Sequence, residues 1–136
     1  MFVLDTNVLS ELVKPRPNAG VSQQIFDAPN GSLLASEVTR YELRYGASLH
    51  PKPDHMWARI QALILTVPTW VPVNAEISER TGVIAAELAR KGQPAGAIDP
   101  FIAATAMVLG CPVVTHNRRH FEAIAGLEVI DWHVER

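Results

Sequence analysis

Four side chains with potential oxygen ligands lie at positions where open α/β sheets commonly bind their ligands. Asp5 directly follows the apolar run 2–4, and Asn117 follows another apolar run. Glu42 lies within a helical pattern, and Asp99 begins another one. Because open α/β sheets collect ligands at the carboxyl ends of their strands, we expect these three acids and one amide to meet at one edge of one sheet. An acid directly after a buried strand points to a metal-dependent site.

Each of these side chains also has a purely structural interpretation. Asp99 is followed by Pro100, a pair that is typical of a helix start. Glu42 is consistent with a solvated helical charge, and Asn117 with a residue that shapes a turn. Asp5 is the hardest to explain in this way, because a carboxylate beside a buried strand is costly without a partner. The joint pattern is therefore more specific than any of its members.

The elements that must position these residues follow from the apolar periodicity. Strands are predicted at 2–4, 32–35, 70–73, 112–115 and 127–132. Helices are predicted at 6–14, 37–49, 54–67, 75–91, 101–109 and 117–125. A further short helix after Asn18 is expected to turn Val21, Ile25 and Phe26 inward. Strands separated by helices predict an α/β fold with a central, mostly parallel sheet covered by helices on both faces.

The composition fits a single domain of 136 residues with one core. The net charge of −2 gives no sign of nucleic-acid binding, although a local basic patch is enough to bind phosphates. Cys111 is the only cysteine, so no disulfide can form within the chain, which fits a reducing cytoplasm. No apolar stretch approaches the roughly 20 residues that span a bilayer, and no signal peptide is recognisable. We therefore expect a cytoplasmic protein without a membrane partner.

Four segments of the chain form a joint pattern. They are Asp5-Thr6-Asn7 after a short strand, Thr39-x-x-Glu42-Leu43-x-x-Gly46, Asp99 with Ile102-Ala103-Ala104, and Val114-Thr115-His116-Asn117 with Phe121. These segments resemble the motifs of PIN-domain nucleases, and among these the chain is most similar to VapC-type toxins of type II toxin–antitoxin modules. The resemblance covers residues 2–132, and the order and spacing of four motifs make it more specific than any one of them.

The resemblance implies a single PIN domain over residues 1–136, folded as a three-layer α/β/α sandwich around a parallel sheet of four or five strands. It implies a Mg²⁺- or Mn²⁺-dependent endoribonuclease toxin that cleaves RNA, forms a homodimer and is silenced by a cognate antitoxin. The metal ligands would be Asp5, Glu42 and Asp99, with Asn117 as a fourth catalytic position. The supporting positions would be Thr6, Asn7, Thr39 and Thr115.

One segment departs from the family pattern. Many relatives carry a fourth acid after the last strand but one, where this chain has the neutral Asn117. His120 stands where Asp or Glu often precedes the Phe. Asn117 would then ligate through its amide oxygen or organise a bound water, and the second metal position stays open.

The acids suit hydrolysis by a metal-activated water. Mg²⁺ prefers oxygen ligands and keeps several waters. Asp5 and Asp99 would ligate the ion directly or through water, and Glu42 would complete its shell or orient the attacking water, whose pKa the metal lowers.

Basic residues near the acids are candidates for binding the RNA backbone, with solvated surface charge as the alternative. They are Arg40, Arg44, Arg118 and Arg119. His116 and His120 are further candidates for contact with RNA, whereas His50, His55 and His133 are expected at the surface. No cluster in the sequence has the spacing of a zinc site.

Two other functions stay open at this point. A PIN fold that only binds RNA or protein is consistent with the missing fourth acid. An aspartate-dependent phosphatase is consistent with Asp5-Thr6-Asn7, although Asn7 replaces its second Asp and its lysine is not evident. The stretch 41–67 is expected to form the core or a groove for an antitoxin. The sequence leaves open the RNA target, the antitoxin type and the number of metal ions.

Overall fold

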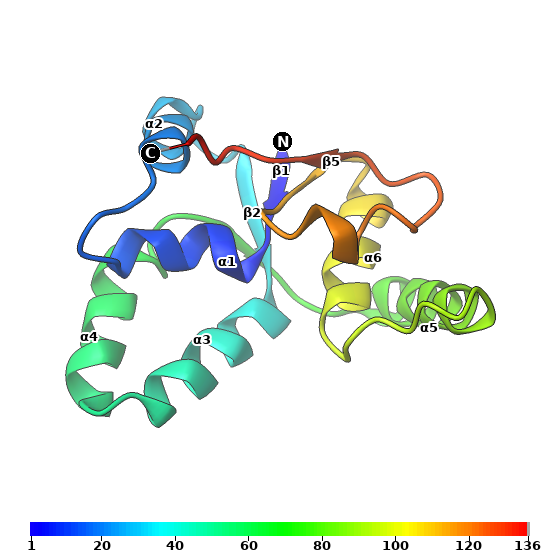
Figure 1. Ribbon diagram of the computed structural model, residues 1–136, viewed down its shortest axis with the longest axis horizontal. Coiled ribbons are helices and arrows are strands. Elements are labelled where there is room, and N and C mark those ends of the chain that lie inside the picture. The colour runs from blue at the N-terminus through cyan, green and yellow to red at the C-terminus, as the bar shows by residue number, and fades with distance from the viewer. Residues whose placement is uncertain (136) are drawn as a thin grey trace.

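The computed structural model describes residues 1–135, which form a parallel β-sheet between two layers of helices (Figure 1). The five strands lie in the order β3-β2-β1-β4-β5, and every pair is parallel. Their bounds are β1 Phe2–Leu4, β2 Leu33–Ser36, β3 Thr69–Val71, β4 Val113–Val114 and β5 Val129–Ile130. The predicted α/β class and parallel central sheet are confirmed.

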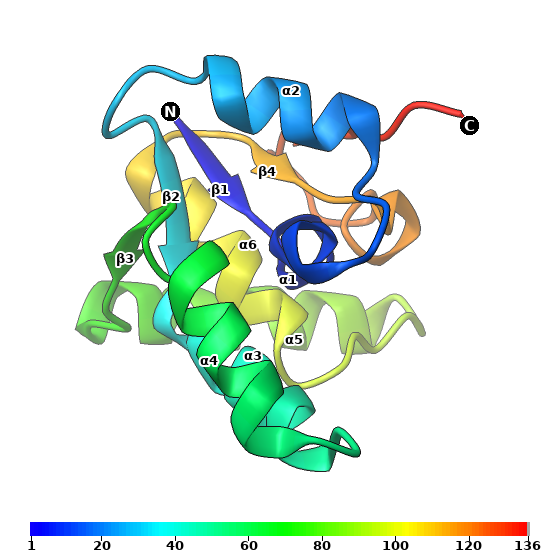
Figure 2. The ribbon, with the colours of Figure 1, turned by 90° about the vertical axis from the view of Figure 1, so that its left-hand side faces the viewer.

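Helices cover both faces of this sheet (Figure 2). One face carries α5 (Ala75–Arg90) and α6 (Asp99–Leu109), which pack against each other. The elements on the other face are α1 Thr6–Leu9, the 3₁₀ turn η1 Ser10–Val13, α2 Ala19–Asp27, α3 Glu37–Leu49 and α4 Pro53–Leu63. The predicted three-layer sandwich is therefore also present.

The two layers follow from the alternation of side chains along each strand, since successive residues of a strand point to opposite faces. Val3 and Val113 are fully buried in a core shared with apolar side chains of α5 and α6. Leu4 and Val114 are fully buried in a second core with side chains of α1, α3 and α4. Short apolar strands are thus covered on both faces, as parallel sheets require.

Several predicted helices are shorter in the structure. The helix expected over 6–14 consists of α1 and then η1, and the helix expected over 54–67 ends at Leu63. The polar segment 117–125 forms only the 3₁₀ turn η2 (Arg118–His120). Hydrogen bonds from the N–H of one residue to the carbonyl three positions earlier dominate this segment, which is the 3₁₀ and not the α-helical pattern.

Phe26 was expected on the inner face of α2, and this expectation is wrong. Val21 is fully buried and Ile25 packs against the same core, but Phe26 is 86% exposed. Phe26 follows Val21 by five residues, which rotates it by roughly 140° around the helix and away from the inner face.

The chain after β5 returns to the start of α2. Asn18 caps α2 and also donates from Nδ2 to the Val134 carbonyl at 2.8 Å. Its Oδ1 accepts the Val134 N–H at 3.1 Å. Val134 is therefore held at the N-cap of α2 by side-chain hydrogen bonds and not by sheet pairing.

Within residues 1–135 no helix combines the length and apolarity needed to cross a membrane.

Candidate active site

Asp5 lies at the carboxyl end of the central strand and is only 5% exposed. Its Oδ1 accepts the Thr6 N–H at 2.7 Å, and its Oδ2 accepts the Thr115 hydroxyl at 2.8 Å. Burial raises the pKa of Asp5 to about 6, because these two hydrogen bonds only partly offset desolvation and the charges of Asp99 and Glu42 raise the pKa further. None of its contacts in the described chain is with a positively charged side chain.

Glu42 reaches the same edge of the sheet from α3. The Ser36 side chain caps this helix at the end of β2, so α3 starts where the strand stops. The Thr6 hydroxyl donates to Glu42 Oε1 and lies 3.3 Å from the hydroxyl of the fully buried Thr39. Burial raises the pKa of Glu42, the Thr6 hydrogen bond lowers it, and the charge of Asp99 raises it again, with a net upward shift.

Asp99 is the first residue of α6, and its side chain is 20% exposed. The capping interpretation of Asp99 is wrong, since the N-cap is Ile98 and no side chain caps this helix. Asp99 Oδ2 instead lies 3.0 Å from His120 Nδ1. His120, the residue at the position where an acid was expected from the family pattern, therefore contacts Asp99.

Thr115 connects the end of β4 to this site. Its hydroxyl donates to Asp5, accepts the Asn117 N–H at 2.9 Å and lies 3.4 Å from Asn7 Nδ2. Asn7 Oδ1 in turn accepts the His116 N–H at 3.3 Å. Asn117 itself is exposed, so its amide lies at the rim of the site and not beside the buried Asp5.

A cleft of about 540 Å³ unites these groups, since Asp5, Glu42, Asp99, Asn117 and His120 all line it. Carboxylate and amide oxygens are the donors that Mg²⁺ and similar hard cations prefer, so the residues present fit such an ion.

Two further polar residues that line the cleft, Ser10 and Lys14, were not predicted from the sequence. They follow Asn7 by three and seven positions, a helical spacing that was available as a signal. Lys14 Nζ pairs with Glu11.

Arg40 and Arg44 do not line the cleft. Arg40 donates to Glu37 through Nε at 2.6 Å and a second guanidinium nitrogen at 3.1 Å, and its guanidinium lies 4.4 Å from the Trp70 ring centroid. Arg44 lies 4.6 Å from the ring centroid of Trp57. Both guanidinium groups therefore lie against aromatic rings, and Arg40 is also paired with Glu37.

Arg118 and Arg119 lie next to the cleft and are both exposed. Arg118 Nε is 3.4 Å from Glu122 Oε1. Arg119 lines a neighbouring depression of about 850 Å³, which shares Gly96, Asp99 and His120 with the cleft. Lys91, Arg119 and Glu122 are the charged residues that line this depression besides Asp99.

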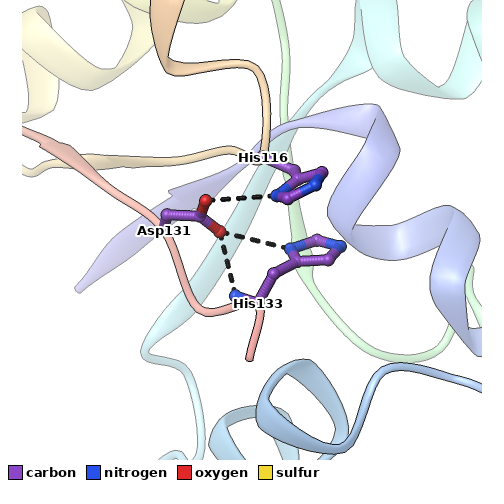
Figure 3. A group of neighbouring side chains, drawn as sticks. All are labelled: His116, Asp131 and His133. Atoms are coloured by element: carbon purple, nitrogen blue, oxygen red, sulfur yellow. Dashed lines mark hydrogen bonds and ion pairs between the residues drawn. The ribbon is translucent and has the colours of Figure 1, made fainter. Parts of the chain in front are cut away.

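His133 was expected at the surface, and this expectation is wrong, because its side chain is only 11% exposed. It lies beside His116 and Asp131, which come from different segments (Figure 3). Since no two of these residues have the spacing of a zinc motif, their meeting could not be predicted from the sequence.

The fold and the acidic cleft are those of a PIN domain, and the PIN-domain family model matches residues 2–127. Curated relatives narrow the class to VapC proteins. A VapC of Shigella flexneri named as a tRNA(fMet)-specific endonuclease is 37% identical, with 96% of this chain and 97% of the relative covered. A Haemophilus influenzae protein named ribonuclease VapC is 33% identical, with 96% and 97% covered. The chain belongs to the VapC family of PIN-domain proteins.

Solved structures agree with this assignment. The DNA-bound VapBC complex of Salmonella typhimurium contains a chain with a TM-score of 0.82 and 35% identity, and the match covers 96% of this chain and 97% of that chain. The FitAcB structure of Neisseria gonorrhoeae contains one with a TM-score of 0.85 and 28% identity, covering 98% and 100%. The resemblance to VapC-type PIN domains noted in the sequence is confirmed.

Proposed function

We propose that this chain, as a single PIN domain, is an endoribonuclease toxin that cleaves RNA with Mg²⁺ or Mn²⁺ held by Asp5, Glu42 and Asp99. One observation carries the proposal. Three carboxylates from separate parts of the chain line one cleft. The charges of Asp99 and Glu42 raise the pKa of Asp5, the charge of Asp99 raises the pKa of Glu42, and no positively charged side chain of the described chain contacts Asp5. A divalent cation relieves this repulsion and supplies a water of lowered pKa together with charge stabilisation at the phosphate.

The residues of the chain orient the ligands. Both oxygens of Asp5 are fixed, one by a backbone N–H and one by the Thr115 hydroxyl, so the carboxylate presents its remaining lone pairs in one direction. Thr6 fixes Glu42 in the same way. Asn117 and His120 complete the rim, and His120 is placed to hold Asp99 or to contact the RNA.

The contacts of Asn7 bear on the phosphatase alternative. That pattern needs a second acid at this position, whereas the neutral Asn7 side chain contacts the Thr115 hydroxyl and accepts the His116 N–H. This supports a metal ligand and not a nucleophile as the role of Asp5. The binding-only alternative rests on Asn117 in place of an acid, and the cleavage assay below separates it from the enzyme.

The relatives suggest both the substrate and the partner. Two of them, at 37% and 35% identity, are named as tRNA(fMet)-specific endonucleases, and we propose a tRNA as the substrate of this chain, in the cytoplasm where tRNA is found. The solved neighbours are toxin–antitoxin complexes, and we propose that this chain also binds a cognate antitoxin and forms a homodimer. Exposed Tyr41, Tyr45 and Leu49 on α3 offer apolar surface for such contacts.

The decisive experiment is cleavage of initiator and elongator tRNA transcripts by the purified chain. We expect cleavage with Mg²⁺ or Mn²⁺, none with EDTA, and none for Asp5→Asn, Glu42→Gln or Asp99→Asn. Glu79→Gln is the matched control, because Glu79 is an exposed acid on α5 outside the cleft. Cleavage that survives EDTA and Asp5→Asn would overturn the metal mechanism. RNA binding without any cleavage would favour the binding module.

A further inference from the structure

A second cluster of metal-ligating side chains lies outside the proposed active site. His116 follows β4, and Asp131 and His133 follow β5, so three residues from two chain segments meet (Figure 3). They line a pocket of about 540 Å³ that also includes Glu11 and Lys14. Lys14 is the only described residue that this pocket shares with the acidic cleft.

The three side chains point toward one another. His116 Nδ1 lies 3.1 Å from Asp131 Oδ2, and His133 Nδ1 lies 3.3 Å from Asp131 Oδ1. One ligand atom from each residue lies within 4.8 Å of the other two. Zinc bonds to nitrogen of about 2.0–2.1 Å place tetrahedral ligands roughly 3.3 Å apart. The group therefore reaches the dimensions of a metal site with small side-chain rotations.

One ligand atom in the cluster lacks a hydrogen-bond partner. His133 Nδ1 is buried, and among the described residues it makes no hydrogen bond, although Asp131 is within ion-pair distance. Buried polar atoms of native proteins are usually satisfied, so an orphaned imidazole nitrogen aimed at a carboxylate calls for a ligand. A cation between them would satisfy both groups.

The opposite nitrogen of the same ring faces a carboxylate. His133 Nε2 lies 3.8 Å from Glu11 Oε2, which also pairs with Lys14 Nζ. Glu11 is 3% exposed, and its other oxygen accepts the Asn18 N–H at 2.8 Å. Histidines that bind a metal through one nitrogen commonly direct the other toward a carboxylate, which fixes the tautomer and raises the basicity of the ligand. Glu11 is the carboxylate that faces this nitrogen here, at ion-pair and not at hydrogen-bond distance.

We propose that His116, Asp131 and His133 form a binding site for a zinc-like transition-metal ion, separate from the acidic cleft. Two imidazoles and a carboxylate are a donor set that suits Zn²⁺, whereas Mg²⁺ prefers oxygen ligands alone. Exposed His116 gives the ion access, and water completes its coordination. The two rings stack at 3.8 Å between centroids and would splay slightly to accept the ion.

The position of this site gives it a structural role. Asp131 and His133 belong to the segment after β5, which the sheet does not hold, and His116 is the neighbour of both Thr115 and Asn117. A bound ion would therefore tie the C-terminal segment to the loop that supports Asp5. The proposal does not depend on nuclease activity, because it rests on a different set of side chains.

The test is zinc binding by untagged, chelator-treated protein, measured by calorimetry and by thermal unfolding. We expect one high-affinity Zn²⁺ per chain, a rise in Tm of several degrees, and no displacement by millimolar Mg²⁺. His116→Ala and His133→Ala should each weaken binding by more than about 100-fold, because loss of a direct ligand exceeds the loss of a supporting residue. Imidazole NMR signals of both histidines should shift together on saturation.

Matched controls separate this site from the others. His55→Ala removes an exposed histidine outside the cluster and should bind Zn²⁺ like the parent protein. Asp5→Asn should also retain binding, which distinguishes the cluster from the acidic cleft. Since His133 is largely buried, circular dichroism checks its variant, and the exposed His116 provides the test if that variant unfolds. Binding lost in Asp5→Asn but kept in His116→Ala, or no zinc binding by the parent protein, overturns the proposal.

Discussion

At the scale of single residues, the feature with the largest consequence is a carboxylate buried at the end of the central strand. Burial, assisted by the neighbouring acids, raises the pKa of Asp5 to about 6 although two hydrogen bonds favour its charged form. In the unfolded chain its pKa is near the ordinary value of 3.8. The unfolded state therefore releases this proton first as the pH rises, and Asp5 destabilises the fold progressively from about pH 4 to pH 6 and fully above that.

Asp5→Asn should consequently abolish RNA cleavage and leave the free energy of unfolding unchanged or raised at pH 7.5. The shift corresponds to roughly 3 kcal/mol at most, because one pKa unit is about 1.4 kcal/mol. Denaturant unfolding at pH 7.5 and pH 4 measures it. The gain should fall to about 0.5 kcal/mol at pH 4, where the parent Asp5 is protonated in the folded state and only partly ionised in the unfolded state. A variant that is less stable at pH 7.5 would show that the charge of Asp5 stabilises the fold.

The same pKa predicts the pH dependence of metal binding. Below about pH 6 a proton occupies Asp5, and an incoming Mg²⁺ must displace it, so affinity should fall as the pH drops from 8 to 5. Calorimetry in two buffers of different ionisation enthalpy should detect proton release at pH 6 and almost none at pH 8. Affinity that does not change over this range would argue against Asp5 as a ligand.

At the scale of elements, the site depends on where helices begin relative to strands. The Asp5 side chain caps α1, and Ser36 caps α3, so both helices start at the carboxyl end of a strand. Their mutual hydrogen bonds through Thr6 then bring Glu42 to Asp5. The other contact between elements on which the fold depends is that of the C-terminal segment with the start of α2.

Gly20 allows the backbone of the C-terminal segment to approach α2 closely. A Cβ at Gly20 would lie 2.2 Å from the Trp132 carbonyl, a backbone atom, whereas one at Gly82 in α5 would meet nothing within 4 Å. Gly20→Ala should therefore destabilise the protein by about 1–3 kcal/mol despite the higher helix propensity of alanine. Gly82→Ala should stabilise it by about 0.5–1 kcal/mol. Urea unfolding measures both, and equal effects would contradict the close packing of residue 132 on α2.

At the scale of the whole molecule, a net charge of −2 hides an uneven distribution of charge. Asp5, Glu42 and Asp99 line the cleft, and Lys91, Arg119 and Glu122 line the depression that adjoins it. A nucleic acid that enters along this depression would place phosphates against the arginine before it reaches the acids. Local charge and not net charge then decides binding.

Arg119→Ala should weaken RNA binding and reduce the slope of log affinity against log salt by about 0.7–0.9, the contribution of one phosphate contact. Binding is measured in the Asp5→Asn background, so that cleavage does not interfere. Arg40→Ala is the control, because Arg40 is paired with Glu37 and lies over Trp70 away from the cleft. If Arg40→Ala reduces the slope and Arg119→Ala does not, the RNA follows a path along α3.

The sequence by itself determined the class of fold and the core of the candidate site. Alternating apolar runs specify which faces are buried, so the order of strands and helices is readable residue by residue, as in α3, whose predicted bounds 37–49 match the structure. Asp5 and Asp99 were recognisable because each stands at the junction of an element, a local property. The resemblance to the family motifs added Glu42 to the predicted site.

Tertiary structure alone decided which distant side chains meet. The bonds of Asp5 with Thr115 and of His120 with Asp99 join residues 110 and 21 positions apart, and their partners follow from strand order and loop path and not from local periodicity. Burial of His133 beside His116 and Asp131 has the same cause. Local patterns encode what is buried, whereas the packing of distant segments decides what each buried polar group contacts.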